Sequence, residues 1–191
     1  MEYFQISAPP EPDRREILRY ARAKSDGFLD NAIDSVISEA EGTLSYRLCY
    51  IRVGVTVGDG RVTLGKLTLT SRDLCKNLEG CTEAVIFAAT VGAGIDRLIM
   101  KYGSISPSRA LLLQAYGSER IESLCDCFCA FLTEKTGKTL RPRFSCGYGD
   151  LPLTVQKDIF ALLDCTKIGL TLNDSLSMSP SKSVTAIVGL K

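Results

Sequence analysis

The sequence contains no histidine among its 191 residues. Histidine is the usual general base of nucleophilic catalysis and the commonest protein ligand of transition metals. Its absence excludes Ser-His and Cys-His catalytic triads and every mixed His/Cys zinc site. Any reaction that this chain supports must therefore depend on other side chains or on a bound molecule.

An excess of charge of one sign and a long apolar run are also missing. The 23 basic and 22 acidic side chains are interspersed and give a formal net charge of +1, so no electrostatic argument favours nucleic acid or anionic membrane. No stretch approaches the roughly 18 consecutive apolar residues of a membrane span, and the N-terminus lacks a basic start followed by an apolar run. We therefore expect a soluble, cytoplasmic protein with no nucleic-acid or membrane partner.

Cysteine, by contrast, is plentiful, with eight residues. Without a secretion signal, they are expected to be reduced thiols that pack as small hydrophobes. In the CDCFC segment, Cys125, Cys127 and Cys129 would point about 200° apart at each step of two on a helix, so only the first and last share a side. A tetrahedral metal site would need two more ligands, which favours core packing, with a cysteine-based redox or metal protein as an alternative.

Length and the 45% hydrophobic content predict a single globular unit over 1–191, with 1–14 as an extended lead-in. Helical spacing runs over 15–40 and is interrupted near Gly27. Period-two alternation over 49–57 predicts a half-buried strand, and the 58–60 turn joins it to 61–70 in an antiparallel hairpin.

Further along, the patterns predict helices more often than strands. A short helix over 71–80 is capped by Ser71, an interior strand covers 83–91, and a short helix covers 95–102. A long central helix lies between Pro107 and Gly137, followed by a helix over 153–164, a segment at 168–172 and a last strand at 184–188. The predicted fold class is α+β, a largely antiparallel twisted sheet with a long central helix and flanking helices.

Glycines at the ATVGAGID segment suggest a phosphate-binding loop, because a strand enters it and a helix leaves it. Neither the dinucleotide fingerprint nor the P-loop motif is complete, so a tight strand-to-helix turn is favoured. Asp96 and Arg97 remain candidates for contact with a ligand.

The segment RPRFSCGYGDLP is too irregular for a helix or a strand and places Arg143 four residues ahead of Gly147-Tyr148. A guanidinium matches a carboxylate, and a tyrosine offers a flat face with a hydroxyl at its tip. Gly147 and Gly149 beside Tyr148 let backbone and ligand approach closely. The pattern favours a small zwitterionic or nucleoside-like ligand over an arginine that ties down carbonyls and a tyrosine that covers the core.

The central helix carries a narrow acidic stripe, Glu119, Glu122 and Asp126, on an otherwise apolar circumference. Such a stripe must face water or a wet cavity. In a cavity, the natural task of Asp126 is to bind an amino group or ribose hydroxyls.

Taken together, these residues resemble the activation domain of cobalamin-dependent methionine synthase, in its short free-standing form. The family's S-adenosylmethionine-binding motif, Arg-x-x-x-Gly-Tyr, is met by Arg143, Gly147 and Tyr148, with Cys146 inside the motif. The helix segment LCDCFCAFL is similar to the family helix that carries a ligand-binding acid, which falls on Asp126.

A second part of the resemblance lies downstream. The family's Ser-x-x-Met-x-Pro segment is met by Ser175, Met178 and Pro180, followed by Ser183-Val184. The resemblance covers the C-terminal half closely and the first hundred residues loosely. This chain has Gly149-Asp150-Leu151-Pro152 where the long form has a Pro-Ala-Cys-Pro type sequence, and Asp126 where the family has Glu.

The resemblance implies a component of a cobalamin-dependent methyltransferase system. S-adenosylmethionine would supply a methyl group for reductive methylation of cobalamin that is carried in trans by a corrinoid protein or by a methionine synthase lacking its own activation domain. The electron donor would resemble flavodoxin or ferredoxin. The alternative is a non-catalytic module that senses S-adenosylmethionine or docks on a corrinoid protein.

The resemblance also implies roles for individual residues. Arg143 would bind the methionine carboxylate, Asp126 the amino group or the ribose, and Tyr148 would pack against the nucleoside or methyl side. Cys146 and Gly147 complete the expected S-adenosylmethionine site, and Glu122, Asp96 and Met178 are further candidates. No residue is expected to act as a catalytic nucleophile or metal ligand.

Overall fold

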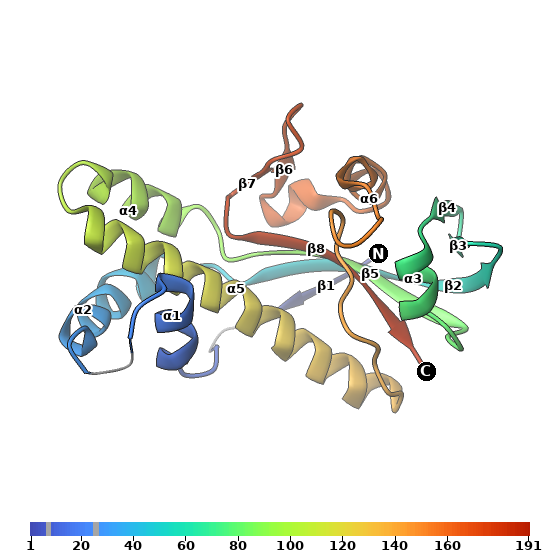
Figure 1. Cartoon of the computed structure of the whole chain (residues 1–191), viewed down its shortest axis with the longest axis horizontal. Helices are drawn as coiled ribbons and strands as arrows, with labels where there is room; N and C mark the ends of the chain where they lie inside the picture. Colours follow the sequence, from blue (N-terminus) through green and yellow to red (C-terminus); the bar gives the residue numbers. More distant parts are fainter. Residues whose placement is uncertain (7–8, 25–26) are drawn as a thin grey trace.

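The computed structural model describes residues 1–6, 9–24 and 27–191. Residues 7–8 of the predicted lead-in and 25–26 of the predicted helical region lie outside the described residues. The centre of the fold is a six-stranded antiparallel sheet in the order β4-β3-β2-β5-β8, with β1 paired to β2 (Figure 1). Its strands are β1 (Glu2–Gln5), β2 (Arg47–Gly58), β3 (Arg61–Leu64), β4 (Leu67–Thr70), β5 (Glu83–Thr90) and β8 (Ser183–Leu190).

Helices cover both faces of this sheet because β5 is apolar on both sides. Phe87 belongs to the core beneath one helical layer, whereas its neighbour Ile86 belongs to the core on the opposite face. All β5 residues from Ala84 to Thr90 are buried, which confirms the predicted interior strand. The mixed fold with an antiparallel sheet and a long central helix is the predicted α+β class.

The longest helix, α5 (Pro107–Thr136), crosses one face of the sheet with α1 (Arg14–Ala21), α2 (Asp30–Ala40) and α4 (Gly94–Gly103) packed against it (Figure 1). Pro107 starts α5, and Gly137 ends it with a left-handed φ of 65°, as predicted. A one-turn 3-10 helix, η1 (Glu41–Thr43), follows α2. The described residues contain no helix that is both long and apolar enough to span a bilayer.

Gly94, the first residue of α4, has a packing role. A Cβ placed on Gly94 would lie 2.0 Å from the carbonyl oxygen of Thr43, so the chain can pass η1 only where that residue has no side chain. This contact supports the interpretation of the segment as a tight turn between β5 and α4.

Smaller elements cover the opposite face. They are α3 (Arg72–Asn77), η2 (Leu153–Val155), α6 (Gln156–Leu162), η3 (Cys165–Ile168) and the two-stranded hairpin of β6 (Thr171–Leu172) and β7 (Met178–Ser179). Ser71 caps α3 through its side chain, which accepts a hydrogen bond from the Leu74 N–H, as predicted.

Several expected boundaries are wrong. Residues 61–70 form two strands, because the chain reverses at 65–66 and pairs Arg61 with Thr70. The predicted helix over 153–164 is η2 followed by α6, which ends at Leu162, and the segment 168–172 is strand only at Thr171–Leu172. The lead-in also contains an unpredicted strand, β1, and its helix α1 already begins at Arg14.

Candidate ligand-binding site

A cavity with a volume of about 820 Å³ lies where α5, the segment after it, α6, the β6–β7 hairpin and the start of β8 meet. This volume is within the usual range of small-molecule sites, about 300 to 1,000 Å³. The residues that line it are Glu122, Cys129, Leu140, Arg141, Pro142, Arg143, Ser145, Cys146, Tyr148, Leu153, Gln156, Leu176, Met178, Ser183, Val184 and Thr185.

The cavity exists because the chain after α5 follows β8 only part of the way. Thr139 and Arg141 donate backbone hydrogen bonds to Lys191 and Gly189, and Phe144 exchanges two bonds with Ile187, at 2.9 and 2.8 Å. Beyond Phe144 the chain turns away from the sheet. The start of β8 therefore faces the cavity instead of another strand.

The loop that turns away holds the predicted Gly147-Tyr148 pair. The Gly147 N–H donates to the Leu151 carbonyl at 2.9 Å and the Leu151 N–H donates to the Tyr148 carbonyl at 3.0 Å, which closes two tight turns. Leu151 is buried, whereas the Tyr148 side chain is 67% exposed and lines the cavity. The loop is thus fixed by its buried end and presents an aromatic ring at the cavity mouth.

Asp150 attaches this loop to α3. Its carboxylate accepts hydrogen bonds from the Ser71 hydroxyl and from the N–H groups of Arg72, at 2.7 Å, and Asp73, at 3.3 Å. These bonds lower the pKa of Asp150 below its ordinary value, and the bond from Ser71 makes the largest contribution. Gly149 must be small here, because a Cβ would lie 2.3 Å from the Asp73 carboxylate.

Arg143 forms the charged wall of the cavity. Its Nη2 pairs with the Glu122 carboxylate at 2.6 Å and its Nη1 with the Asp126 carboxylate at 2.5 Å. Burial acts to lower the pKa of Arg143, but the hydrogen bond and charge of Asp126 outweigh it, so the pKa lies above its ordinary value. The cluster joins α5 to the loop segment and places two carboxylates beside one guanidinium.

Other predicted site residues fall in different places. Met178 and Cys146 line the cavity, and burial raises the pKa of the Cys146 thiol to about 11. Cys146 is therefore a neutral thiol near pH 7. Asp126 is 73% exposed and touches the site through Arg143, and Gly147 supplies a turn without lining the cavity. Asp96 lies elsewhere: it accepts hydrogen bonds from the backbone N–H and hydroxyl of Ser181.

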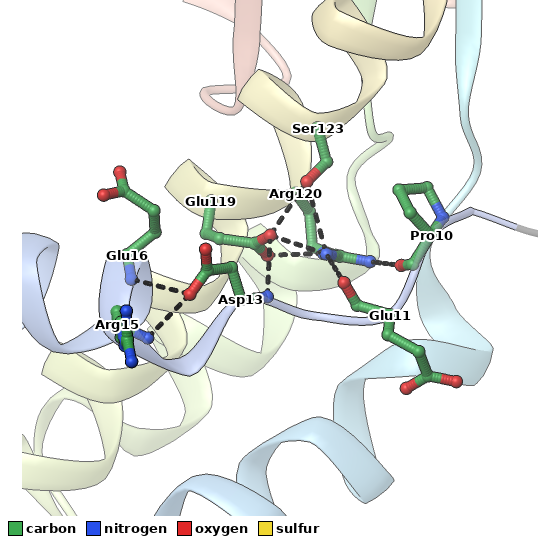
Figure 2. A network of polar contacts seen from close by, with 8 residues as sticks. All are labelled: Pro10, Glu11, Asp13, Arg15, Glu16, Glu119, Arg120 and Ser123. Carbon is green, nitrogen blue, oxygen red and sulfur yellow. Dashed lines mark hydrogen bonds and ion pairs between the residues drawn. The ribbon is translucent and has the colours of Figure 1, made fainter.

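The acidic stripe of α5 is divided between two environments. Glu119 is 3% exposed and pairs with the fully buried Arg120 at 2.5 Å (Figure 2), and it also lines a small cavity of about 190 Å³ together with Glu122 and Asp126. Arg120 also donates to the carbonyls of Pro10 and Glu11, at 2.6 and 3.3 Å. The pair clamps the N-terminal segment onto α5, which no local sequence pattern indicated.

The cysteines are all free thiols. Cys125 is fully buried in the core beneath α5, as predicted for packing, and burial raises its pKa above the ordinary value. Cys129 lines the cavity, and its pKa is raised by burial despite the nearby Arg143. Within the described ranges, no group of three or more Cys, Asp or Glu side chains has an arrangement that could hold a metal ion.

Two kinds of lining residue were missed from the sequence. Leu153, Gln156 and Leu176 come from η2, α6 and the β6–β7 hairpin, and their approach to α5 depends on the tertiary fold. Ser183 and Thr185 come from a strand whose alternation was recognised, but its pairing partner was not.

Comparisons with known proteins bear on the fold. The chain is similar to a solved structure described as the crystal structure of the MetH reactivation domain bound to AdoHcy, with a TM-score of 0.69 and 14% sequence identity over 99% of this chain and 78% of that one. No family model and no curated protein sequence matches. This chain therefore has the fold of that reactivation domain.

Proposed function

We propose that this chain binds S-adenosylmethionine in the cavity beside Arg143 and supports reductive methylation of a cobalamin carried by a methionine synthase or another corrinoid protein. The observation that carries the proposal is the Glu122–Arg143–Asp126 cluster at the wall of a cavity of about 820 Å³. The fold supports it, because the similar reactivation domain was crystallised with AdoHcy, the demethylated product of this methyl donor.

The donor set suits an amino acid head group. Two carboxylates accept hydrogen bonds from Arg143 through its two terminal nitrogens, which leaves further N–H groups of the five-donor guanidinium for a ligand carboxylate. Glu122 lines the cavity and can accept from a ligand ammonium group. Asp126, outside the lining, then holds Arg143 in position.

The rest of the lining suits a nucleoside. Leu153, Leu176 and Met178 supply apolar surface, and Tyr148 supplies an aromatic face at the mouth. A ligand with a charged head and a flat base would therefore meet a matching wall at each end.

Bound S-adenosylmethionine would supply the methyl group, and a protein such as flavodoxin or ferredoxin would supply the electron. The residues of this chain bind and orient the methyl donor at a cavity open to a partner. Cys146 and Cys129, whose pKa values are raised, act as neutral parts of the wall and not as nucleophiles.

The first test is a calorimetric titration of the wild-type chain and of R143M with S-adenosylmethionine. Loss of a charged hydrogen-bond partner should weaken binding by about 1.5 to 3 kcal/mol. R97M is the matched control, because Arg97 is exposed on α4 and does not line the cavity. Equal affinity of R143M and wild type would contradict the proposed site.

Binding alone does not separate a reactivation protein from a sensor of S-adenosylmethionine. A second assay therefore follows methylation of a purified corrinoid protein in its cob(II)alamin form, with a chemical reductant and S-adenosylmethionine. We expect methylcobalamin to form faster with wild type than with R143M. Binding without any methylcobalamin would favour the sensing or docking module.

A further inference from the structure

The outer edge of β8 carries backbone groups that point into the cavity. The Lys182 carbonyl accepts a hydrogen bond from the Val91 N–H at 3.1 Å, so the backbone N–H and C=O groups of the even-numbered residues of β8 point toward β5. The backbone groups of the odd-numbered residues point away from β5: those of Ile187, Gly189 and Lys191 bond to the segment after α5. Because antiparallel pairing alternates, the N–H and C=O groups of Ser183 and Thr185 also point outward.

The segment 139–144, which bonds to the outer edge of β8, does not extend as far as Ser183 and Thr185. It leaves β8 after Phe144, and both residues line the cavity. Within the described part of the chain, no hydrogen bond occupies the outward backbone groups of Thr185, although this residue is only 3% exposed. The Ser183 hydroxyl is already used, since it donates to the Pro180 carbonyl and contacts the Thr90 hydroxyl.

Buried backbone N–H and C=O groups are paired in more than about nine of ten cases, so an edge of this kind requires a partner. Thr185 offers one donor and one acceptor side by side, in the plane of the sheet. The geometry matches a planar ring that carries an acceptor next to a donor on one edge.

We propose that the backbone of Thr185 recognises the Watson–Crick edge of adenine, with its N–H donating to N1 and its C=O accepting from the 6-amino group. This inference rests on the proposed function and extends it, because it names the atoms that select the base. Leu176 and Met178 line the same cavity and provide apolar contact for the ring.

Proline at position 185 tests the donor directly. T185P removes both the outward N–H and the threonine side chain, and an edge strand tolerates proline there. T185A removes the side chain and keeps the N–H, so the difference between the two variants isolates the N–H. The probes are S-adenosylmethionine and 5′-methylthioadenosine, which lacks the amino acid group. We expect T185P to bind both probes at least about tenfold more weakly than T185A, with a melting temperature close to that of T185A.

The wild-type chain provides a second arm that does not depend on how T185P folds. 5′-Methylthioinosine reverses the pattern, with a donor at N1 and an acceptor at position 6. It should bind at least about tenfold more weakly than 5′-methylthioadenosine, since donors would then face donors.

The outcomes separate the two proposals. Binding of 5′-methylthioadenosine without S-adenosylmethionine would contradict the proposed function and leave the base-recognition inference standing. Equal affinities of T185P and T185A, or of the two thionucleosides, would overturn the inference alone. Failure of wild type to bind either adenine probe would overturn both.

Discussion

Leu176 adopts a backbone conformation that leucine rarely occupies. Its φ is 61°, in the left-handed region, and its side chain lines the cavity from the β6–β7 hairpin. This conformation costs most residues about 1 to 2 kcal/mol, whereas glycine or asparagine adopts it with less strain. A strained leucine that faces a cavity is consistent with a side chain retained for ligand contact.

Replacing Leu176 with asparagine should therefore separate stability from binding. We expect L176N to melt within a few degrees of wild type, because relief of strain offsets the lost apolar contact, and to bind S-adenosylmethionine about five- to tenfold more weakly. L172N is the control on the same hairpin, since Leu172 is half-buried and lies outside the cavity lining. It should lose stability and keep its affinity; the same behaviour from both variants would contradict a ligand role for Leu176.

Single residues differ in how far the sequence could predict their place. Arg143 and Tyr148 could be predicted as site residues because a short motif brings an arginine and an aromatic ring into one loop. The ion pairs of Arg143 with two carboxylates could not be predicted, because Glu122 and Asp126 are distant in sequence and lie on α5. The place of Asp96 outside the cavity lining had no local signal for the same reason: its partner, Ser181, is distant in sequence.

Among the elements, α3 matters for the site although it contributes no residue to the cavity lining. Through Asp150 it holds the loop that carries Tyr148. D150A should free the loop and make Cys146, 9% exposed in wild type, react faster with a thiol reagent. We expect an increase of about tenfold in the labelling rate of Cys146, measured by peptide mass spectrometry, with Cys125 unchanged.

The control for this loop is D164A. Like Asp150, Asp164 accepts a hydrogen bond from a hydroxyl group, that of Thr166 at 2.6 Å. Its side chain is 39% exposed and lies outside the lining of the cavity. It should leave Cys146 as slow as in wild type. An unchanged rate in D150A would show that the buried Leu151 alone fixes the loop.

The clamp between α5 and the N-terminal segment predicts a large energetic effect. R120L would leave the Glu119 carboxylate buried without its main partner, which typically costs about 3 to 5 kcal/mol. The double variant E119L/R120L removes both charges and should be less destabilised than the sum of the single variants. Chemical denaturation measures each free energy of unfolding, and strict additivity would contradict the coupling.

At this scale the sequence predicted element types better than their junctions. The apolar circumference of α5, with Pro107 and Gly137 at its ends, indicated its length directly. The sequence did not indicate the turn at 65–66, because the residues on either side of it are equally rich in types that favour β-strands. The path of 139–144 along β8 depends on long-range pairing, so the cavity at its end had no local signal.

For the whole molecule, Glu39 ties three helices of one layer together. From α2 it accepts hydrogen bonds from Arg109 of α5 at 2.5 Å and from Lys101 and Tyr102 of α4 at 3.2 and 2.9 Å. The Arg109 hydrogen bond is the largest contribution that lowers the pKa of Glu39 to about 2. The carboxylate therefore stabilises the fold only while it is ionised.

The sign of the pH dependence follows from this lowered pKa. The stabilisation is complete above the unfolded pKa of about 4.3 and is lost as the pH falls toward about 2. E39Q should therefore be less stable than wild type at pH 7 by about 1 kcal/mol, and the difference should disappear near pH 2. Denaturation at several pH values tests this, with E134Q at an exposed position of α5 as the control; a constant difference would contradict it.

β8 follows every other element of the fold along the chain. It pairs with the interior strand β5 and is the edge strand that faces the cavity. During synthesis from the N-terminus, α5 and the strands up to β5 leave the ribosome well before this strand is made. Until then, the Arg143 segment has no strand to follow and β5 remains an open edge. A nascent chain consequently cannot capture its ligand as a template for folding; the small molecule can act only on the finished domain.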